Sequence, residues 1–239
     1  MIQLEVQGPL LRFSNPTQPG IASPSDLLTI IAGRDLVRPA TVGFANVEAQ
    51  GNVRLTIESL DPTRVLLSTA ANQAGTASLT LTTRPEVVSF YLHALSGAGE
   101  VQIRARAVGY ADATATILLR PSGLLLGLPN NSGNLPYTNI IGAGSFQGAL
   151  STVVVRTSRD PQSDNSYERS PLRPGANWNP VLKASDPNII EVITPQPDIS
   201  TGSAAVQFRA IRPGISNLVV TAAPDIELPR PATVVVRGR

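Results

Sequence analysis

Residues 101–107 read Val-Gln-Ile-Arg-Ala-Arg-Ala, and this stretch shows the pattern that decides the fold. Small or apolar side chains at every second position alternate with Gln102, Arg104 and Arg106. Successive side chains of a β-strand point to opposite faces of the sheet. The alternation therefore predicts a strand with one buried and one solvated face.

The same period of two recurs along most of the 239-residue chain. Further strands are expected at residues 2–6, 27–32, 53–58, 77–82, 87–94, 113–119, 150–156, 189–194, 204–209, 216–222 and 232–237. Valine, isoleucine and threonine supply most of them, as half-buried pleated surfaces favour. Turn-forming pairs such as Asp61-Pro62 and Pro213-Gly214 lie between them. No window of about a dozen residues has helical spacing, so the sequence predicts an all-β sandwich architecture.

Short motifs also repeat in the same order in the two halves of the chain. The paired segments are 59–65 with 185–190, 75–81 with 202–208, 99–103 with 214–218, and 115–120 with 232–237. This order indicates a duplication with insertions and deletions in the loops. The boundary falls at Pro121-Ser122-Gly123. We therefore expect two tandem β-sandwiches, residues 1–121 and 122–239, each long enough for a core of its own.

Composition excludes several classes of site. The chain has no cysteine and one histidine, which excludes disulfide scaffolds, thiolate chemistry and metal centres built from several imidazoles. The net charge is only +2, and no concentrated basic surface suits duplex DNA, so no nucleic-acid partner is expected. No stretch approaches the roughly 20 apolar residues of a membrane span. The first residues do not form a signal peptide, so the chain is either cytoplasmic or an internal piece of a longer exported protein.

One stretch carries a family resemblance. Residues 185–192, Ser-Asp-Pro-Asn-Ile-Ile-Glu-Val, are followed by Ala-Ile-Arg-Pro-Gly at 210–214. Together they resemble the bacterial immunoglobulin-like domains that recur in tandem in invasin- and intimin-type adhesins. The resemblance covers residues 59–120 and 185–237. The family often has a tryptophan shortly before the Ser-Asp-Pro turn, whereas Trp178 lies seven residues before Ser185 and the first half has none there. The resemblance implies immunoglobulin-like sandwiches used as spacers or binding modules, and it supplies no catalytic residues.

Candidate catalytic groups are few. The strand at 87–94 places His93 outward beside Tyr91, as an ordinary surface histidine. The chain has no Gly-x-Ser-x-Gly nucleophile motif. The glycine-rich segment 142–148 lacks the spacing and the lysine of phosphate-binding loops, and we interpret it as a turn leading into the strand at 150–156. These observations predict no enzyme activity and no cofactor.

Aspartates precede proline at positions 61, 160 and 186, where an Asp side chain commonly caps a turn by accepting backbone hydrogen bonds. We prefer this interpretation to paired catalytic carboxylates. Asp160, Asp164 and Glu168 are spaced four residues apart, but no calcium-loop motif surrounds them, and we predict no metal site.

Residues 156–180 form the most informative irregular stretch, because the first half has a far shorter connection at the same place. A long loop on a rigid scaffold is a common place for binding function. Arginine side chains can grip carboxylate or sulfate groups, and aromatic rings are frequent at binding hot spots. The candidate ligand-binding residues are Arg156, Arg159, Tyr167, Arg169, Arg173 and Trp178. The alternative is that the loop packs on its own sandwich, with Trp178 as an apolar anchor.

The sequence thus favours a non-enzymatic spacer or adhesion module, an internal fragment of a larger exported or cell-surface bacterial protein. Its partner would be a protein, a glycan or neighbouring repeats of the same chain. Two alternatives stay open: an accessory β-sandwich region of a polysaccharide-active enzyme, and a structural protein of a phage or secretion apparatus.

Overall fold

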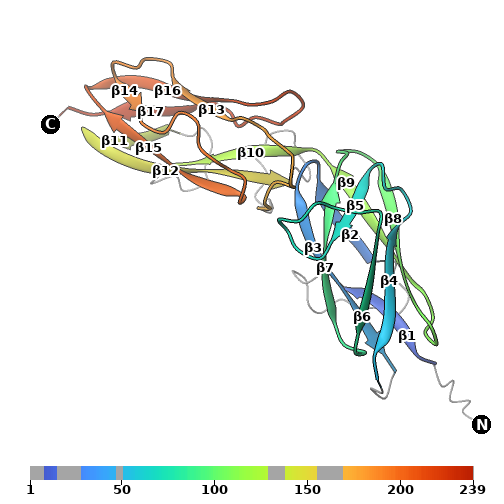
Figure 1. The fold of residues 1–239 in the computed structure, drawn as a ribbon. Coiled ribbons are helices and arrows are strands. Elements are labelled where there is room, and N and C mark those ends of the chain that lie inside the picture. The colour runs from blue at the N-terminus through green and yellow to red at the C-terminus, as the bar shows by residue number, and fades with distance from the viewer. Residues whose placement is uncertain (1–7, 15–27, 47–50, 129–137, 155–168, 239) are drawn as a thin grey trace, which may run out of the picture. The chain divides into compact units, whose positions relative to one another are not determined.

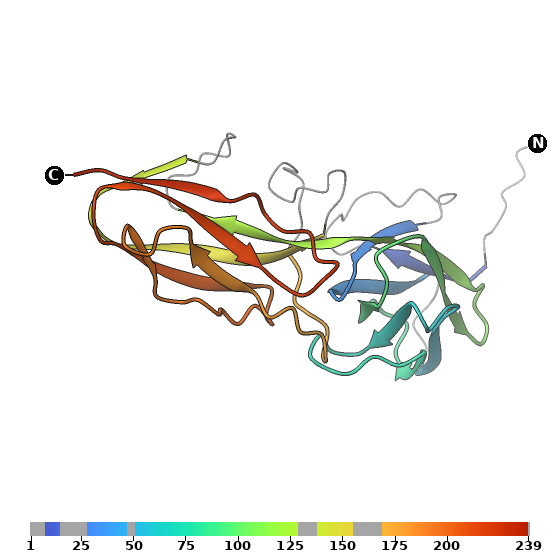
Figure 2. The ribbon, with the colours of Figure 1, turned by 90° about the horizontal axis from the view of Figure 1, so that it is seen from above.

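The computed structural model describes residues 8–14, 28–46, 51–128, 138–154 and 169–238. The chain divides into two compact units, Met1–Arg120 and Pro121–Arg239. The described residues form strands, turns and bends, and contain no helix (Figure 1). The prediction of an all-β fold is therefore confirmed. In each unit the strands form two sheets (Figure 2).

The first unit has nine strands among the residues that the structure describes. One sheet has the order β1 (Leu10–Ser14), β3 (Val37–Ala45), β7 (Val88–Ala94) and β5 (Val65–Ser68), all antiparallel. The other has the order β2 (Leu28–Gly33), β9 (Ala113–Arg120), β8 (Glu100–Ala107), β4 (Val53–Ser59) and β6 (Ser78–Thr83). Its strands are antiparallel except that β2 pairs with β9 in parallel.

The second unit repeats this topology with eight described strands. One sheet has the order β10 (Ser122–Gly127), β12 (Gly144–Val154), β15 (Ser203–Ala210) and β14 (Ile190–Val192). The other has the order β11 (Thr138–Ile141), β17 (Ala232–Val236), β16 (Gly214–Thr221) and β13 (Val181–Ala184). The edge strand β11 pairs with β17 in parallel, as β2 does with β9 in the first unit. Both units are thus immunoglobulin-like sandwiches with the same strand order, apart from β6.

Strand β6 corrects one of the four repeat pairings. The match of residues 75–81 with 202–208 would equate β6 with β15, but the strand orders show that β7 is the counterpart of β15. Nineteen residues separate β5 from β7, whereas ten separate β14 from β15. The first unit uses its longer connection to add the edge strand β6 beside β4. The other three repeat pairs fall on equivalent elements of the two units.

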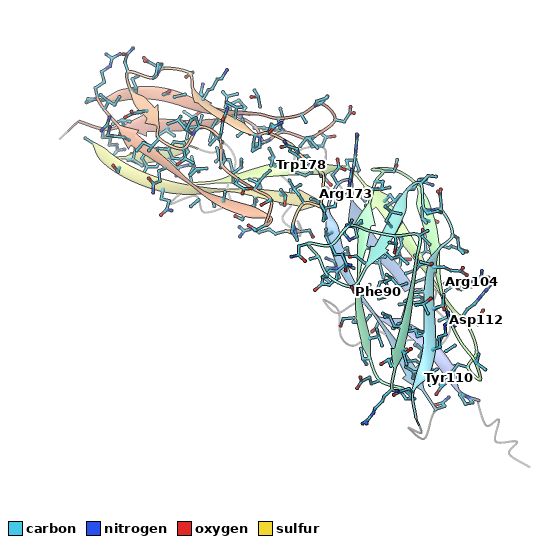
Figure 3. The ribbon with its side chains drawn as sticks, in the orientation of Figure 1. Phe90, Arg104, Tyr110, Asp112, Arg173 and Trp178 are labelled. Carbon is cyan, nitrogen blue, oxygen red and sulfur yellow. The ribbon has the colours of Figure 1, made fainter. Side chains whose placement is uncertain are left out.

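Burial follows the alternation that predicts the strands. In β8, Val101, Ile103 and the alanines are buried, and the polar residues between them are exposed or half-buried. Phe90 lies in the core of the first unit and packs edge-on against Phe13, with ring centroids 6.1 Å apart (Figure 3). In the second unit Phe208 is fully buried and stacks on Phe146. Each such buried apolar side chain contributes about 1.5–3 kcal/mol relative to an exposed one.

The predicted strands that fall on described residues are all present, and the strand at 2–6 lies outside them. The structure adds strands that the alternation does not predict, namely β1, β3, β5, β10, β11 and β13. β3 contains Pro39, which sequence reasoning treats as a strand breaker. Pro39 is tolerated where it stands because pairing with β1 begins only at Thr41.

His93 does not face solvent, so its prediction as a surface histidine is wrong: its exposed fraction is 1%. The segment after β5 doubles back, with Thr76 N donating to Leu67 O at 2.7 Å and Leu67 N donating to Thr76 O at 2.8 Å. This brings Gly75 against the imidazole ring, where a β-carbon would lie 3.3 Å from His93 Cδ2. The outer face of β7 is therefore covered by a segment that strand alternation cannot anticipate.

The glycine-rich segment 142–148 is not the predicted turn. Strand β12 begins at Gly144, and its residues pair with β15 from Gly144 opposite Ala210 onward. Glycine is needed at position 148, because a β-carbon there would lie 2.6 Å from the carbonyl oxygen of Gly127 on the adjacent strand β10. Gly148 therefore permits the close approach of β10 and β12, whereas Gly142 lies in the two-residue connection between β11 and β12 and has open space around it.

The predicted turn caps at Asp61 and Asp186 are confirmed. Asp61 Oδ1 accepts hydrogen bonds from Thr63 N at 3.2 Å and from Thr63 Oγ1 at 2.6 Å. Asp186 Oδ1 accepts from Asn188 N at 2.9 Å. Asp160 lies outside the described residues, as do Asp164 and Glu168. The carboxylates of Asp61 and Asp186 therefore stabilise the turns in which they lie.

Candidate binding pocket

The second unit contains a pocket with a volume of about 400 Å³. Its lining comes from two segments far apart in the sequence: Leu172 with residues 176–181, and residues 196–200. The first segment is the end of the long 156–180 stretch and the start of β13, and the second lies between β14 and β15. The volume is within the range of about 300–1,000 Å³ that small-molecule sites occupy.

Backbone hydrogen bonds join the two pocket walls at both ends. Leu172 N donates to Ser200 O at 3.0 Å, and Leu182 N donates to Pro195 O at 2.8 Å. On the first wall nine residues lie between the linked positions Leu172 and Leu182. On the second wall only four residues lie between Pro195 and Ser200. The longer wall must therefore bow away from the shorter one, and the pocket lies between them.

Exposed and buried residues alternate along both walls. On the first wall Asn177 and Asn179 are exposed, whereas Trp178 and Pro180 are buried. On the second wall the buried residues are Pro197 and Ile199, and the exposed ones are Gln196, Asp198 and Ser200. The pocket thus has an apolar floor and a polar rim of three amides, one carboxylate and one hydroxyl.

The first wall is held by a local turn. Asn177 Oδ1 accepts a hydrogen bond from Asn179 N at 3.1 Å. Asn179 has φ of 43°, in the left-handed region that asparagine tolerates better than most residues. Between them, Trp178 O accepts from Ala223 N at 2.8 Å, which ties this wall to the segment after β16. These bonds fix the backbone of the first wall between Asn177 and Asn179.

Trp178 has an exposed fraction of 1%, and its indole Nε1 is buried without a hydrogen-bond partner. A buried donor left unpaired costs about 1–3 kcal/mol. Unpaired buried groups are rare in native proteins and call for an explanation such as a bound water or ligand. Trp178 is one of the pocket-lining residues, and its buried indole lies next to the pocket.

Asp198 gives the rim its charge. Its Oδ1 accepts a hydrogen bond from Ser200 N at 2.9 Å. The Ser200 backbone N–H, followed by the Ser200 side chain, lowers the pKa of the Asp198 carboxyl below its ordinary value. The carboxylate is therefore ionised at neutral pH. Among the described parts of the chain, no arginine, lysine or histidine belongs to the pocket lining.

Thr152 on β12 fixes the segments that lead into both walls. Its side chain is buried, and its hydroxyl is within hydrogen-bond reach of the carbonyl oxygens of Ser170 and Gly202, at 3.3 Å for Gly202. Gly202 has φ of 97°, and a β-carbon there would lie 3.1 Å from the carbonyl carbon of Ser170. Thr152 and Gly202 thus hold the start of the first wall against the turn that follows the second.

The predicted ligand-binding residues fall in three places. Arg156, Arg159 and Tyr167 lie outside the described residues. Arg169 is exposed and forms a backbone bridge with Val153. Arg173 is half-buried beside the pocket but does not line it, and its Nη1 donates to Pro174 O at 3.4 Å. Arg173 and Trp178 are marked in the second unit (Figure 3).

Trp178 is the predicted site residue that lines the pocket. Because its ring is buried, it does not offer an open flat face to a ligand. Sequence reasoning missed Asn177, Asn179 and the second wall. The Pro-Gln-Pro-Asp run at 195–198 marks a loop, but nothing in the sequence indicates that it lies opposite Trp178.

Metal-binding clusters and membrane-spanning helices are both absent from the described ranges. These residues contain no group of three or more histidine, aspartate and glutamate side chains that could hold a metal ion. Nor do they include a helix long and apolar enough to cross a membrane.

No protein-family model matches the sequence, and no curated protein is similar to it. Solved structures similar to the chain include the D0-D1 domain of intimin, at 13% identity and a TM-score of 0.30, covering 85% of this chain and 91% of that one. Invasin, a bacterial integrin-binding protein, matches at 13% identity and a TM-score of 0.32, covering 98% of this chain and 40% of invasin. Domains 4 and 5 of the S-layer protein SbsC match at 10% identity and a TM-score of 0.36, covering 77% of each chain.

These neighbours include the invasin- and intimin-type domains that the sequence motifs resemble. The immunoglobulin-like assignment of each unit rests on its own strand order, which both units share.

Proposed function

We propose that this chain is a non-enzymatic module of a larger exported or cell-surface protein, and that its second unit carries a ligand-binding site at the pocket beside Trp178. The single observation that carries the proposal is the joining of the end of the long 156–180 stretch to residues 195–200 around that pocket.

The two units share a scaffold, so a segment present in only one of them is not required by the fold. Twenty-six residues connect β12 to β13, whereas seven connect the equivalent strands β3 and β4. What the sandwich itself needs is expected in both units. The additional residues of the second unit supply one wall of the pocket, and binding sites are commonly carried by such loops on a rigid scaffold.

The first unit supports a spacer role. Two of its carboxylates are paired with arginines on the sheet surface: Arg104 Nε donates to Glu58 Oε1 at 2.6 Å, and Arg106 Nε to Asp112 Oδ2 at 3.1 Å. Figure 3 marks Arg104 and Asp112 in this unit. The buried Ser68 and His93 side chains are closed off from substrate. These arrangements suit a folded structural element.

Location is tested on cells that produce the full-length protein. We expect a membrane-impermeant label to reach the single lysine, Lys183, on intact cells. Labelling that occurs only after lysis would contradict the exported assignment. A catalytic domain encoded next to this chain in the same gene would instead favour an accessory region of a polysaccharide-active enzyme. The polar pocket is compatible with that alternative as well.

Binding is tested by replacing residues 155–180 with residues 46–52 of the first unit and screening both proteins against host proteins and glycans. We expect any ligand of the intact chain to be lost in the exchanged protein. Undiminished binding would show that the stretch is structural. If the exchanged protein fails to fold, the point variant Asn179→Gly is screened in its place. Glycine readily adopts the left-handed conformation of residue 179, so this variant is expected to fold.

A further inference from the structure

We propose that the pocket beside Trp178 binds a neutral, hydroxyl-rich ligand, a saccharide ring, and not an anion. The inference rests on the proposed function and gives it a ligand class. It differs from the expectation that the arginines of the 156–180 stretch grip a carboxylate or sulfate, because none of the described residues that line the pocket is an arginine.

Charge is the first argument. The Asp198 carboxylate stands at the rim, and its pKa is lowered, so it stays negative at neutral pH. The lining residues that the structure describes contain no cation to offset it. A ligand carboxylate, sulfate or phosphate entering the pocket would meet a like charge at short range, which is unfavourable. A neutral hydroxyl would instead donate to Asp198 a charge-assisted hydrogen bond, which is stronger than one between neutral groups.

Hydrogen-bonding capacity is the second argument. The amides of Asn179 and Gln196 each carry both a donor and an acceptor at the rim. Asn177 Oδ1 is engaged with Asn179 N, which leaves the Asn177 amide chiefly as a donor. A hydroxyl also donates and accepts, so an array of hydroxyls can match amides whichever way they are turned. An apolar ligand would leave these amides unpaired, and a purely anionic group would pair only with their donors.

The floor supplies the third argument. A sugar ring has an apolar face of C–H groups and hydroxyls around its edge. The buried prolines and Ile199 beneath the polar rim match this division. The volume of about 400 Å³ is at the small end of ligand pockets.

The chain offers its own probe, because Trp178 is its single tryptophan. The full chain labelled with ¹⁵N at the indole gives one indole resonance. It is titrated with glucose, galactose, mannose and N-acetylglucosamine and their short oligomers, and separately with glucuronate, galacturonate and sulfated sugars at the same concentrations. We expect a saturable shift of the indole resonance with at least one neutral sugar and none with its acidic counterpart.

Three variants sharpen the result. Asn179→Gly keeps the left-handed backbone and removes one rim amide, and we expect affinity for the neutral sugar to fall roughly three- to tenfold. Asn46→Gly is the matched control, since Asn46 has a similar φ of 59° in the first unit, and it should leave binding unchanged. Asp198→Asn removes the rim charge and is expected to narrow the discrimination against acidic sugars.

Absence of a saturable shift with every neutral sugar in the panel overturns the inference, and so does a saturable shift with the acidic sugars alone. If the inference fails while exchange of residues 155–180 still abolishes binding of another ligand, the proposed function stands. If that exchange changes no binding, the proposed function fails by itself.

Discussion

Ser68 Oγ and His93 Nε2 lie 2.6 Å apart in the interior of the first unit, and both side chains have an exposed fraction of 1%. The same serine oxygen donates to Ala70 O at 2.7 Å, within the segment that folds over β7. A serine and a histidine at this distance resemble the start of a catalytic arrangement, but catalysis requires that substrate reach the nucleophile. Here the pair links strand β7 to the covering segment and has a structural role.

Replacing Ser68 with alanine is expected to destabilise the first unit. The change removes the hydroxyl that contacts His93 Nε2 and leaves buried polar groups less well satisfied, at a cost of about 1–3 kcal/mol. Urea unfolding followed by circular dichroism measures the loss. Ser78→Ala is the control, because Ser78 is exposed on the edge strand β6. Equal unfolding midpoints for the two variants would show that the buried contact contributes nothing.

Gly148→Ala should destabilise the second unit. The added methyl group would lie 2.6 Å from the carbonyl oxygen of Gly127 and 3.0 Å from Leu128 Cδ2, so β10 and β12 would have to move apart. Overpacking of this kind typically costs about 1–3 kcal/mol. Gly142→Ala is the matched control from the same glycine-rich segment, because a β-carbon there meets nothing within 4 Å. Thermal unfolding distinguishes them, and an unchanged melting temperature for Gly148→Ala would contradict the close approach of these strands.

Thr152→Val is expected to loosen the pocket walls. Valine has nearly the same shape as threonine but lacks the hydroxyl that reaches Ser170 O and Gly202 O. We expect a loss of about 1–3 kcal/mol in unfolding free energy, together with faster hydrogen exchange at Leu172 N, which is bonded to Ser200 O. Thr152→Ser retains the hydroxyl and should preserve the protection at Leu172. Protection that is equal in all three proteins would exclude this role for Thr152.

Acid should weaken the turn at residues 198–200. The pKa of Asp198 is lowered in the folded chain, so its ionised form is favoured there over the unfolded state. The contribution of Asp198 to the free energy of unfolding is fully present above the pKa of an unfolded aspartate, about 3.9. It is lost as the pH falls through the lower pKa of the folded state. Carboxyl NMR across the acid range measures the Asp198 pKa directly. In Asp198→Asn this part of the pH dependence should vanish, and a titration of Asp198 at or above the ordinary value would disprove the effect.

Local pattern was sufficient where one segment decides its own conformation. Strand β8 was predicted because its alternating side chains must face opposite sides of a sheet, and the caps at Asp61 and Asp186 were predicted because an Asp side chain bonds backbone only two residues away. The duplication was visible for the same reason, since equivalent strands keep equivalent patterns. The mispaired motif at 75–81 shows the limit: β6 and β15 have similar composition, and only hydrogen-bonded neighbours distinguish them.

The sequence alone determined the all-β class, the two-sandwich organisation and most of the strands. The tertiary structure decided which surfaces remain open. His93 has the alternation of a surface residue, and it is buried because residues that precede it by about twenty positions fold over it. Likewise, the alternation along 177–180 and 196–199 is local, but the pocket between them exists because backbone bonds such as Leu172–Ser200 bring together segments distant in the chain. Such long-range contacts depend on the whole sandwich being folded, and no local pattern encodes them.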